Sequence, residues 1–409
     1  MSRIRQVSIP VFLFLMFFSP QLYAQLDTRL ISADIVRVLS KDLFDLNSTA
    51  FMQPMVETFN ATANAGFYHT AFVPAQDTLY VRFGLRGMFG FVRDDQLTYH
   101  PAIPTEPTEN EVANVLSIGI ANKIKTIFKR GIEADSIQVP PESATVLGFL
   151  AAEFDLNREY LRRELRNDPD VQAAMLDSNL IDQILDGLPN ALALPTGADI
   201  STIAAIVPQV EVGSLFGTEL LFRYVPPVKL DTNVGTFTFW GVGLKHNLSH
   251  YLTSRFDLSL QLVYQQTSLK NSVGVTAAEL EAEGETFNAN VHASKRLGNL
   301  TLYSGLGLER SNIVATYIYT LPRQLQAQLG LITPIDLNND GRIDDDEFVP
   351  DPENGFPGDT KPQQSRVELS ASNLQWTVGA DYQIGPVQLF ADFKVGSFNI
   401  FSGGVLVGF

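Results

Sequence analysis

Several segments of this chain alternate apolar and polar residues with a period of two. The clearest are 79–91, 255–265, 287–297, 374–382 and 387–395. In the fourth of these the apolar positions are Leu374, Trp376, Val378, Ala380 and Tyr382. Successive side chains of a β-strand point to opposite faces, so the pattern predicts strands that have one apolar and one polar face.

Ten candidate strands can be marked along the chain. They are 62–73, 77–91, 210–224, 234–248, 255–269, 286–297, 299–318, 366–382, 386–396 and 400–409. An apolar face toward lipid and a polar face toward a lumen is the pattern of a transmembrane barrel with an even strand number. We therefore predict a mainly β fold, an antiparallel transmembrane β-barrel of about ten strands within a range of 8–14. A secreted β-sandwich, whose strands also alternate, is the alternative.

Residues 1–24 have the organisation of a cleaved signal peptide. Arg3 and Arg5 precede a short apolar run, Val11 to Phe18, and a small residue, Ala24, stands before the expected cleavage point. The apolar run is shorter than the roughly 20 residues that a spanning helix needs, which argues against an N-terminal anchor. No later segment has eighteen unbroken apolar residues. A mature chain that crosses a membrane must then do so as a closed barrel.

The residues between the candidate strands predict which connections lie on each side. If the terminal Phe409 lies at the periplasmic rim, the connections 225–233, 270–285 and 319–365 are external, and the shorter ones at 249–254 and 297–299 are periplasmic. Long external loops and short periplasmic turns are expected of such barrels. Because successive connections of an up-and-down barrel alternate between its two rims, the same counting places residues 92–209 on the periplasmic side.

Residues 92–209 interrupt the strand pattern with helical periodicity. Apolar residues recur at helical spacing between Val112 and Phe128, and further helical stretches run from Leu156 to Arg166 and from Val171 to Leu185. We predict a helical insertion that either caps the barrel in the periplasm or plugs its lumen. Residues 25–60, also partly helical, form an N-terminal periplasmic or plug segment, and 61–409 form the barrel domain.

Charge and composition exclude several classes of function. The chain carries a net charge of −16, and removal of residues 1–24 takes away two arginines and no acid, which leaves −18. An acidic protein of this kind is not expected to bind nucleic acid. The absence of cysteine excludes disulfides, thiol catalysis and cysteine-ligated metals.

One motif indicates specific chemistry. The sequence DLNNDGRIDDDEF, residues 336–348, resembles the calcium loop of an EF-hand. The resemblance implies ligands from Asp336, Asn338, Asp340, Arg342 (through its carbonyl), Asp344 and Glu347. Gly341 would allow the sharp turn. The predicted cofactor is therefore Ca2+, bound with a dissociation constant on the order of 10⁻⁴–10⁻³ M, as in extracellular modules. The alternative is a solvated acidic turn.

The motif is only partly flanked by helix. Leu325 to Leu329 could form a short entering helix, whereas Pro350 and Pro352 argue against an exiting one.

No enzyme signature is evident, so the protein is expected not to be an enzyme. His246 and His250 are predicted to be surface residues near a membrane interface, whereas His69 and His292 show no ligand spacing. Charged residues predicted to face the lumen are Arg82, Arg86, Glu219, Arg223, Lys245, Asp257, Arg296, Asp392 and Lys394. Paired charges in a lumen are expected to hold a narrow barrel together.

Three stretches resemble known sequences. PQVEVGSLFGTELLFRY (208–224), GVGLKHNLSHYL (241–252) and NAGFYHTAF (64–72) are similar to blocks in uncharacterised outer-membrane proteins of Gram-negative bacteria, and more distantly to fatty-acid transporter barrels. The alternating segment that ends in Phe409 is similar to the ending by which outer-membrane barrels are recognised for assembly. The resemblance implies an outer-membrane location.

Three functions are compatible with these features. The first is a channel or transporter for small or apolar solutes. The second is a structural or adhesion barrel that displays a calcium-ordered surface loop, and the third is a barrel hydrolase. The expected partners are outer-membrane lipid, a calcium ion and a small-molecule solute that the sequence does not identify.

Overall fold

A computed structural model describes residues 27–409, except 64, 75–78, 110–112, 114, 174–177, 232–234, 274–277, 322, 338–340, 343, 345 and 346. The segment predicted to be a signal peptide lies outside the described residues. All statements below concern the described part of the chain.

Ten antiparallel strands close into one barrel in the order β1-β16-β15-β14-β11-β10-β9-β8-β7-β6. Their bounds are β1 Tyr80–Phe91, β6 Thr202–Leu215, β7 Thr218–Asp231, β8 Gly235–Asn247, β9 Asp257–Val273, β10 Ala278–Leu297, β11 Leu300–Tyr319, β14 Gln363–Ile384, β15 Val387–Val395 and β16 Ile400–Gly408. Strand β1 closes the barrel because it pairs with β16 on one side and β6 on the other. The predicted fold class is confirmed.

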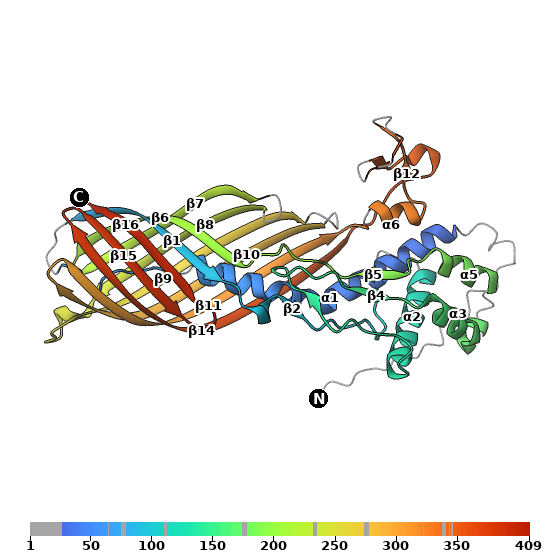
Figure 1. The fold of residues 1–409 in the computed structure, drawn as a ribbon, viewed down its shortest axis with the longest axis horizontal. Helices are drawn as coiled ribbons and strands as arrows, with labels where there is room; N and C mark the ends of the chain where they lie inside the picture. The colour runs from blue at the N-terminus through green and yellow to red at the C-terminus, as the bar shows by residue number, and fades with distance from the viewer. Residues whose placement is uncertain are drawn as a thin grey trace.

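The two rims of the barrel differ in their connections. The C-terminal rim, which carries Phe409, has short turns between β6 and β7, β10 and β11, and β14 and β15. The opposite rim carries the two longest connections, residues 92–201 and 320–362. Figure 1 shows both on the same side of the barrel, away from the C-terminus. We call residues 92–201 the head and 320–362 the loop unit.

On β8, β9, β10, β11 and β14 the outward face is mostly apolar near the C-terminal rim and mostly polar toward the head. Counted from the C-terminal rim, the outward apolar run ends at Trp240, Tyr264, Phe287, Leu308 and Leu374 on β8, β9, β10, β11 and β14. The next outward positions toward the head are Thr238, Gln266, Glu285, Arg310 and Ser372. On β11, two half-buried apolar residues, Val314 and Ile318, face outward nearer the head. The residues of the outward apolar run form an apolar band of even height around this part of the barrel, with polar residues beyond it. Such a band is the surface that a lipid bilayer covers.

The inward face changes in the opposite sense. Inside the apolar band it is polar, whereas beyond the band it carries Phe237, Phe239, Leu269, Ile313 and Leu369, all buried. On each long strand, the apolar side chains therefore mostly face outward within the band and inward beyond it, and the change occurs at about the same height on these strands. Outside lipid, the apolar residues must be inside to be removed from water.

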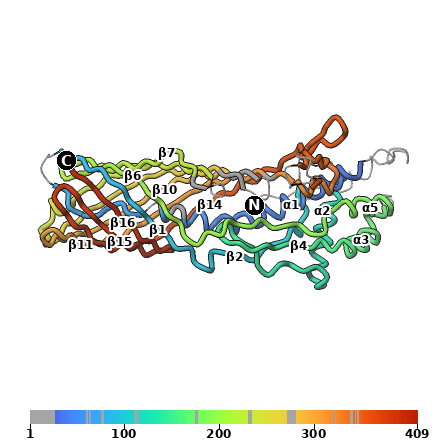
Figure 2. The backbone as a smooth tube through the Cα atoms, turned by 45° about the horizontal axis from the view of Figure 1, so that its top comes forward, coloured from blue at the N-terminus to red at the C-terminus, as the bar shows by residue number. Residues whose placement is uncertain are grey.

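A single long helix, α1 (Thr28–Ala63), fills the end of the barrel nearest the head. The half from Phe44 to Val56 packs against the apolar inner faces of the strands. The ring of Phe44 stacks on Tyr317 of β11 with 4.0 Å between centroids. Figure 2 shows α1 running from the head into the barrel. None of the described helices, α1 included, is long and apolar enough to cross a membrane.

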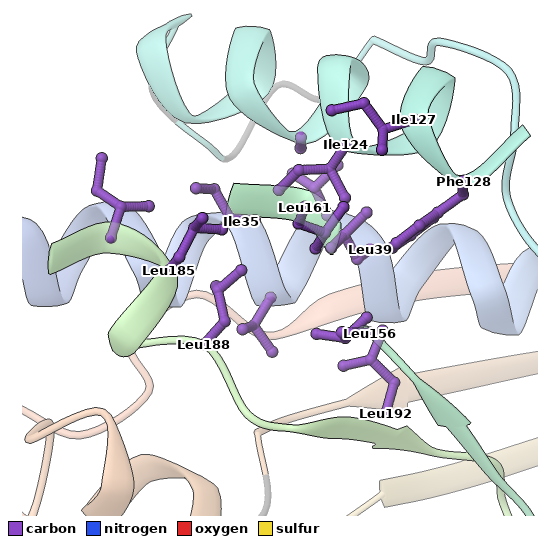
Figure 3. Packing of buried hydrophobic residues seen from close by; sticks show 14 of the residues in the cluster. Ile35, Leu39, Ile124, Ile127, Phe128, Leu156, Leu161, Leu185, Leu188 and Leu192 are labelled. Atoms are coloured by element: carbon purple, nitrogen blue, oxygen red, sulfur yellow. The ribbon is translucent and has the colours of Figure 1, made fainter. Parts of the chain in front are cut away.

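The other half of α1 is the centre of the head. Ile35 and Leu39 lie among apolar residues of α2 (Val115–Glu133), α3 (Arg158–Asn167) and α5 (Ser178–Asp186), as Figure 3 shows. The short helix α4 (Pro169–Ala173) adds Val171. Two small sheets, β2 (Thr98–Tyr99) with β3 (Ser143–Ala144) and β4 (Glu153–Asp155) with β5 (Ala191–Ala193), complete the head.

The loop unit is also attached to α1. It contains α6 (Arg323–Gln328) and the strand pair β12 (Thr333–Pro334) and β13 (Phe348–Val349). The buried guanidinium of Arg37 on α1 lies 2.8 Å from the carboxylates of both Asp34 and Asp359. One helix thus joins the barrel, the head and the loop unit.

Two of the ten predicted strands are wrong. One of them is not a strand and the other contains parts of two strands, so the predicted number of ten is still correct. Residues 62–73 are not a strand, because the barrel closes without them and they pass through its lumen. Residues 210–224 contain a hairpin, since β6 ends at Leu215 and β7 begins at Thr218. Its two-residue turn has positive φ at Phe216 (51°) and Gly217 (72°). Such turns usually have Asn or Asp before the glycine, so the Phe concealed this one.

The missed hairpin also reversed the predicted side of the helical insertion. Residues 92–209 were expected at the rim opposite 319–365, but the head and the loop unit share one rim. The insertion is shorter as well, because Thr202 to Pro208 belong to β6. Ile203 and Val207 point into the apolar part of the lumen, so this part of the strand is apolar on both faces and shows no alternation.

The apolar band predicts a position-dependent cost of charge on β11. Leu306 is outward-facing and 58% exposed within the band, so Leu306→Arg should lower the free energy of unfolding by about 2–4 kcal/mol in lipid vesicles. Asn312 faces outward on the same strand beyond the band. Asn312→Arg should therefore change the free energy of unfolding by less than about 0.5 kcal/mol. Denaturant unfolding of vesicle-embedded protein measures both. Equal costs would show that lipid does not cover this face.

Candidate functional site

The most elaborate polar site of the described chain lies inside the barrel, around residues 65–74, which we call the strap. The strap follows α1 and runs through the lumen toward the C-terminal rim. Every residue from Ala65 to Ala71 is buried. Gly66 has φ 63°, and a Cβ there would lie 3.1 Å from the Arg86 side chain. The turn and the close approach to Arg86 both require glycine.

His69 joins two sides of the barrel through its ring. Its Nε2 lies 3.3 Å from Glu211 of β6, and its Nδ1 lies 3.2 Å from Asp381 of β14. Four steps separate these strands around the ten-stranded barrel, so the imidazole sits in the interior of the lumen. Both carboxylates are buried, and buried carboxylates need such partners.

The two residues before His69 are held by ring contacts. Tyr68 stacks on His292 of β10 with 3.9 Å between centroids. The Arg223 guanidinium of β7 lies 4.8 Å from the centre of the Phe67 ring, a cation–π contact. These side chains fix the strap at one position along the barrel.

The strap backbone is recognised separately, through its carbonyl oxygens. Arg223 donates to the carbonyls of Ala65 and Gly66, both at 2.9 Å. Gln261 donates to Phe67 at 3.3 Å, Lys245 to Thr70 at 3.3 Å and Ser259 to Ala71 at 2.5 Å.

Three more donors continue the row toward the C-terminal rim. Asn247 (3.3 Å) and His250 (3.0 Å) donate to Val73, and Ser214 donates to Pro74. All these donors come from β6 to β9 and the short helix η4 (Leu248–His250) after β8.

The wall also carries its own ion pairs. Arg82 lies 3.3 Å from Glu211 and 3.2 Å from Glu219, and Lys245 lies 2.6 Å from Glu219. Tyr80 donates to Glu219 at 2.6 Å. This network orders the side chains that face the strap on β1, β6, β7 and β8.

The lumen is less completely filled on the side of β10 to β15. A cavity of about 10 Å³ lies between strap residues Gly66 to Tyr68 and a wall that includes Asn288, Gln375 and Lys394. That volume holds about one water molecule. Buried polar atoms without a hydrogen-bond partner in the described structure include both terminal nitrogens of Arg86, Gln375 Nε2 and Glu309 Oε2. Such atoms usually mark water or an exchangeable ligand.

A second cavity of about 40 Å³ lies nearer the head. Met55 and Val56 of α1 line it together with Phe237, Leu269 and Ile313 of the barrel. It is apolar, so the lumen has a polar and an apolar part in succession.

Most residues predicted to face the lumen do so. Arg86, Glu219, Arg223, Lys245, Asp392 and Lys394 are buried in it, and Arg82 is half-buried. Asp257 is half-buried at the start of β9. The prediction for Arg296 is wrong, because its exposed side chain bonds Gly298 and Gln383 at the C-terminal rim.

The four histidines divide into two pairs. His246 and His250 lie at a strand end and in the following turn, as expected. His292 lies on the polar face of the strand predicted at 286–297 and is buried in the lumen, and His69, to which the sequence assigned no role, is buried there as well. A possible signal for His69 was its place in a segment of mostly apolar and small residues, NAGFYHTAF, which has no charged neighbours to mark it as exposed.

The predicted calcium loop is described only in part. Asn338 and Asp340 lie outside the described residues, whereas Asp336, Arg342, Asp344 and Glu347 are described. Among the described residues, no group of three or more His, Asp or Glu is arranged to hold a metal ion. The structure therefore leaves this site as a prediction.

The described part of the loop has a tight internal geometry. Glu347 is buried and accepts the N–H groups of Leu337 (2.8 Å) and Asp344 (3.0 Å). Asp336 accepts the N–H of Gly341 at 3.0 Å, and Gly341 has φ 77°. Helix α6 enters the loop close to the predicted Leu325–Leu329, and β13 with the short helix η7 (Pro352–Asn354) follows it.

Comparison with solved structures finds several low-similarity matches. Ail, the attachment invasion locus protein of Yersinia pestis, is 10% identical, covers 47% of this chain and 95% of its own, and has a TM-score of 0.22. The translocator domain of the autotransporter NalP from Neisseria meningitidis is 9% identical, covers 90% of this chain and 98% of its own, and has a TM-score of 0.22. OccK3 from Pseudomonas aeruginosa is 10% identical, covers 50% and 68%, and has a TM-score of 0.13. Values this low carry no information about function.

Comparison with curated proteins gave no match. Comparison with family models gave one that spans the chain. The sequence resemblance to outer-membrane proteins without assigned chemistry agrees with that result, and the more distant one to fatty-acid transporters stays untested. Because the model described as "Family of unknown function (DUF6588)" matches residues 1–409, the chain belongs to that family.

Proposed function

We propose that this protein is an outer-membrane channel or transporter whose passage is closed by its own N-terminal segment. The observation that carries the proposal is a barrel lumen occupied by α1 in its apolar part and by the strap in its polar part, both held to the wall by non-covalent contacts. A purely structural barrel could fill its lumen with wall side chains alone. Here the filling is a separate segment that could move.

The size of the barrel supports this reading. An eight-stranded barrel is just wide enough for its own side chains, and the diameter grows with strand number. Ten strands here enclose a helix at one level and an extended segment at another. Displacement of the strap would therefore open the polar part of the lumen to about the width of a peptide chain. A continuous passage requires that the part of α1 inside the barrel shifts as well. Such a passage suits a small solute, and the apolar cavity beside Met55 suits an apolar one.

The rims support an orientation. Outer-membrane barrels have short periplasmic turns and longer external loops. The C-terminal rim has the two-residue turns, so it is assigned to the periplasm, and the head and the loop unit are assigned to the cell surface. This assignment replaces the periplasmic location expected for residues 92–209.

A second function is a structural or adhesion barrel that displays a calcium-ordered loop. The loop unit lies on the head side and is fixed to α1 through Arg37 and Asp359. Asp336, Asn338, Asp340, Asp344 and Glu347 with the carbonyl of Arg342 would supply the oxygen ligands that calcium prefers. The bound ion would offset the repulsion among these carboxylates. A hydrolase is the third candidate, to be tested by a substrate screen.

The channel proposal predicts that a weakened strap opens the barrel. Tyr68→Ala/His69→Ala removes the stack on His292 and the contacts to Glu211 and Asp381. In planar bilayers it should raise the open probability at least tenfold above the near-closed wild type, as expected if the closed state loses about 1.4 kcal/mol. The matched control is His246→Ala/Tyr251→Ala, which removes a stacked His–Tyr pair outside the strap contacts. Wild-type conductance in the strap variant, or equal changes in both variants, would rule out this form of gating.

The calcium proposal predicts metal-dependent protection of the loop unit. At about 1–10 mM calcium, above the expected dissociation constant, protease cleavage within 330–360 should slow severalfold. Asp336→Ala/Glu347→Ala should abolish the effect, whereas Glu353→Ala, an exposed acid outside the loop, should keep it. The same digest on intact cells tests whether the loop unit is external. Protection that survives in the double variant would reduce the loop to a charged turn.

A further inference from the structure

We propose that the wall formed by β6, β7, β8 and β9 is a binding site for the backbone of a peptide segment, and that the strap occupies it as a resident peptide. The inference rests on the proposed function in one respect, since it names the class of molecule that the passage would hold. That class is a peptide chain with free carbonyl oxygens.

The pattern of hydrogen bonds carries the inference. Seven strap carbonyls, those of Ala65, Gly66, Phe67, Thr70, Ala71, Val73 and Pro74, accept hydrogen bonds from wall side chains. By contrast, the one strap N–H shown to donate to a wall side chain is that of Ala71, to Ser294 of β10. The wall is thus a row of donors that follows the strap backbone past its turn at Gly66 and its bends at His69 and Ala71.

Donors of this kind do not distinguish one sequence from another. Every peptide residue presents a carbonyl, at a spacing close to 3.3 Å per residue when extended. Arg223, Lys245 and Ser259 contact backbone atoms here, so a peptide with other side chains could make the same bonds. Sequence-specific contacts are made to other strap atoms: Glu211 and Asp381 bind His69, and His292 stacks on Tyr68. Arg223 also contacts the ring of Phe67.

The two kinds of contact use mostly different strands, since Asp381 and His292 lie on β14 and β10, whereas the carbonyl donors lie on β6 to β9. Substitution of Tyr68 and His69 therefore leaves every carbonyl donor in place. The opposite wall leaves the small polar cavity and the unpartnered Gln375 Nε2 beside the strap. Peptide side chains that differ from those of the strap would therefore meet a wall that leaves room for about one water molecule. The donor row would be unchanged.

The resident strap explains why a free peptide would bind wild-type protein weakly. The strap is covalently joined to α1, so it competes at a high effective concentration. Removal of its own side-chain contacts lowers that advantage and leaves the donor row intact. Binding of an added peptide should then become measurable.

The experiment uses the full chain in detergent micelles. The probe is a fluorescent, N-acetylated and C-amidated peptide with the sequence of residues 65–74, AGFYHTAFVP, and binding is followed by anisotropy. Tyr68→Ala/His69→Ala should bind the probe at least tenfold more tightly than wild type. Adding Lys245→Met and Ser259→Ala, which removes two carbonyl donors, should weaken binding at least tenfold again. A scrambled peptide of the same composition should bind the strap variant within about fivefold of the probe.

Three outcomes would overturn the proposal. They are a strap variant that binds no more tightly than wild type, wall substitutions without effect, and a scrambled peptide that fails to bind. A heat-shift gel confirms that each variant is a folded barrel, and His69→Gln, which preserves side-chain size, replaces the double variant if that one is unfolded. Peptide binding without conductance would retain this site and reject the channel, and conductance without peptide binding would do the reverse.

Discussion

The interior of a closed barrel has to be filled, and in this protein the chain's own N-terminal segment fills it. Helix α1 occupies the apolar part and the strap the polar part. The same helix forms the centre of the head core and anchors the loop unit through Arg37. Because one helix belongs to both cores, the head cannot be separated from the barrel without exposing apolar surface on each.

Along the long strands the apolar side chains face outward at one end and inward at the other. The reason is that one end of each strand is surrounded by lipid and the other by water. In lipid the outward side chains must be apolar, and the lumen can carry Glu211, Lys245 and Asp392 because each finds a partner. Beyond the lipid the outward side chains meet water, and the apolar ones turn toward α1. The level of this change therefore marks the membrane boundary independently of the loops.

The lumen wall binds the strap's side chains and the strap's backbone through different contacts. His69 and Tyr68 are bound by particular partners, which set the position of the strap, whereas Arg223, Lys245 and Ser259 bind carbonyl groups that any peptide offers. A closed channel and a peptide-binding wall are compatible uses of this arrangement.

The sequence alone determined the fold class and most of the lumen, because a strand between lipid and a polar interior must alternate with period two. Only the tertiary structure decided what alternation does not encode. Ile203 to Pro208 is apolar on both faces, Phe216–Gly217 makes a turn without the usual residues, and the strap is buried from Ala65 to Ala71. Because the Phe216–Gly217 turn cannot be recognised from the sequence, the head was predicted at the wrong rim of the barrel. His69 became a functional candidate only when closure of the barrel brought Glu211 and Asp381, far apart in the chain, to its two nitrogens.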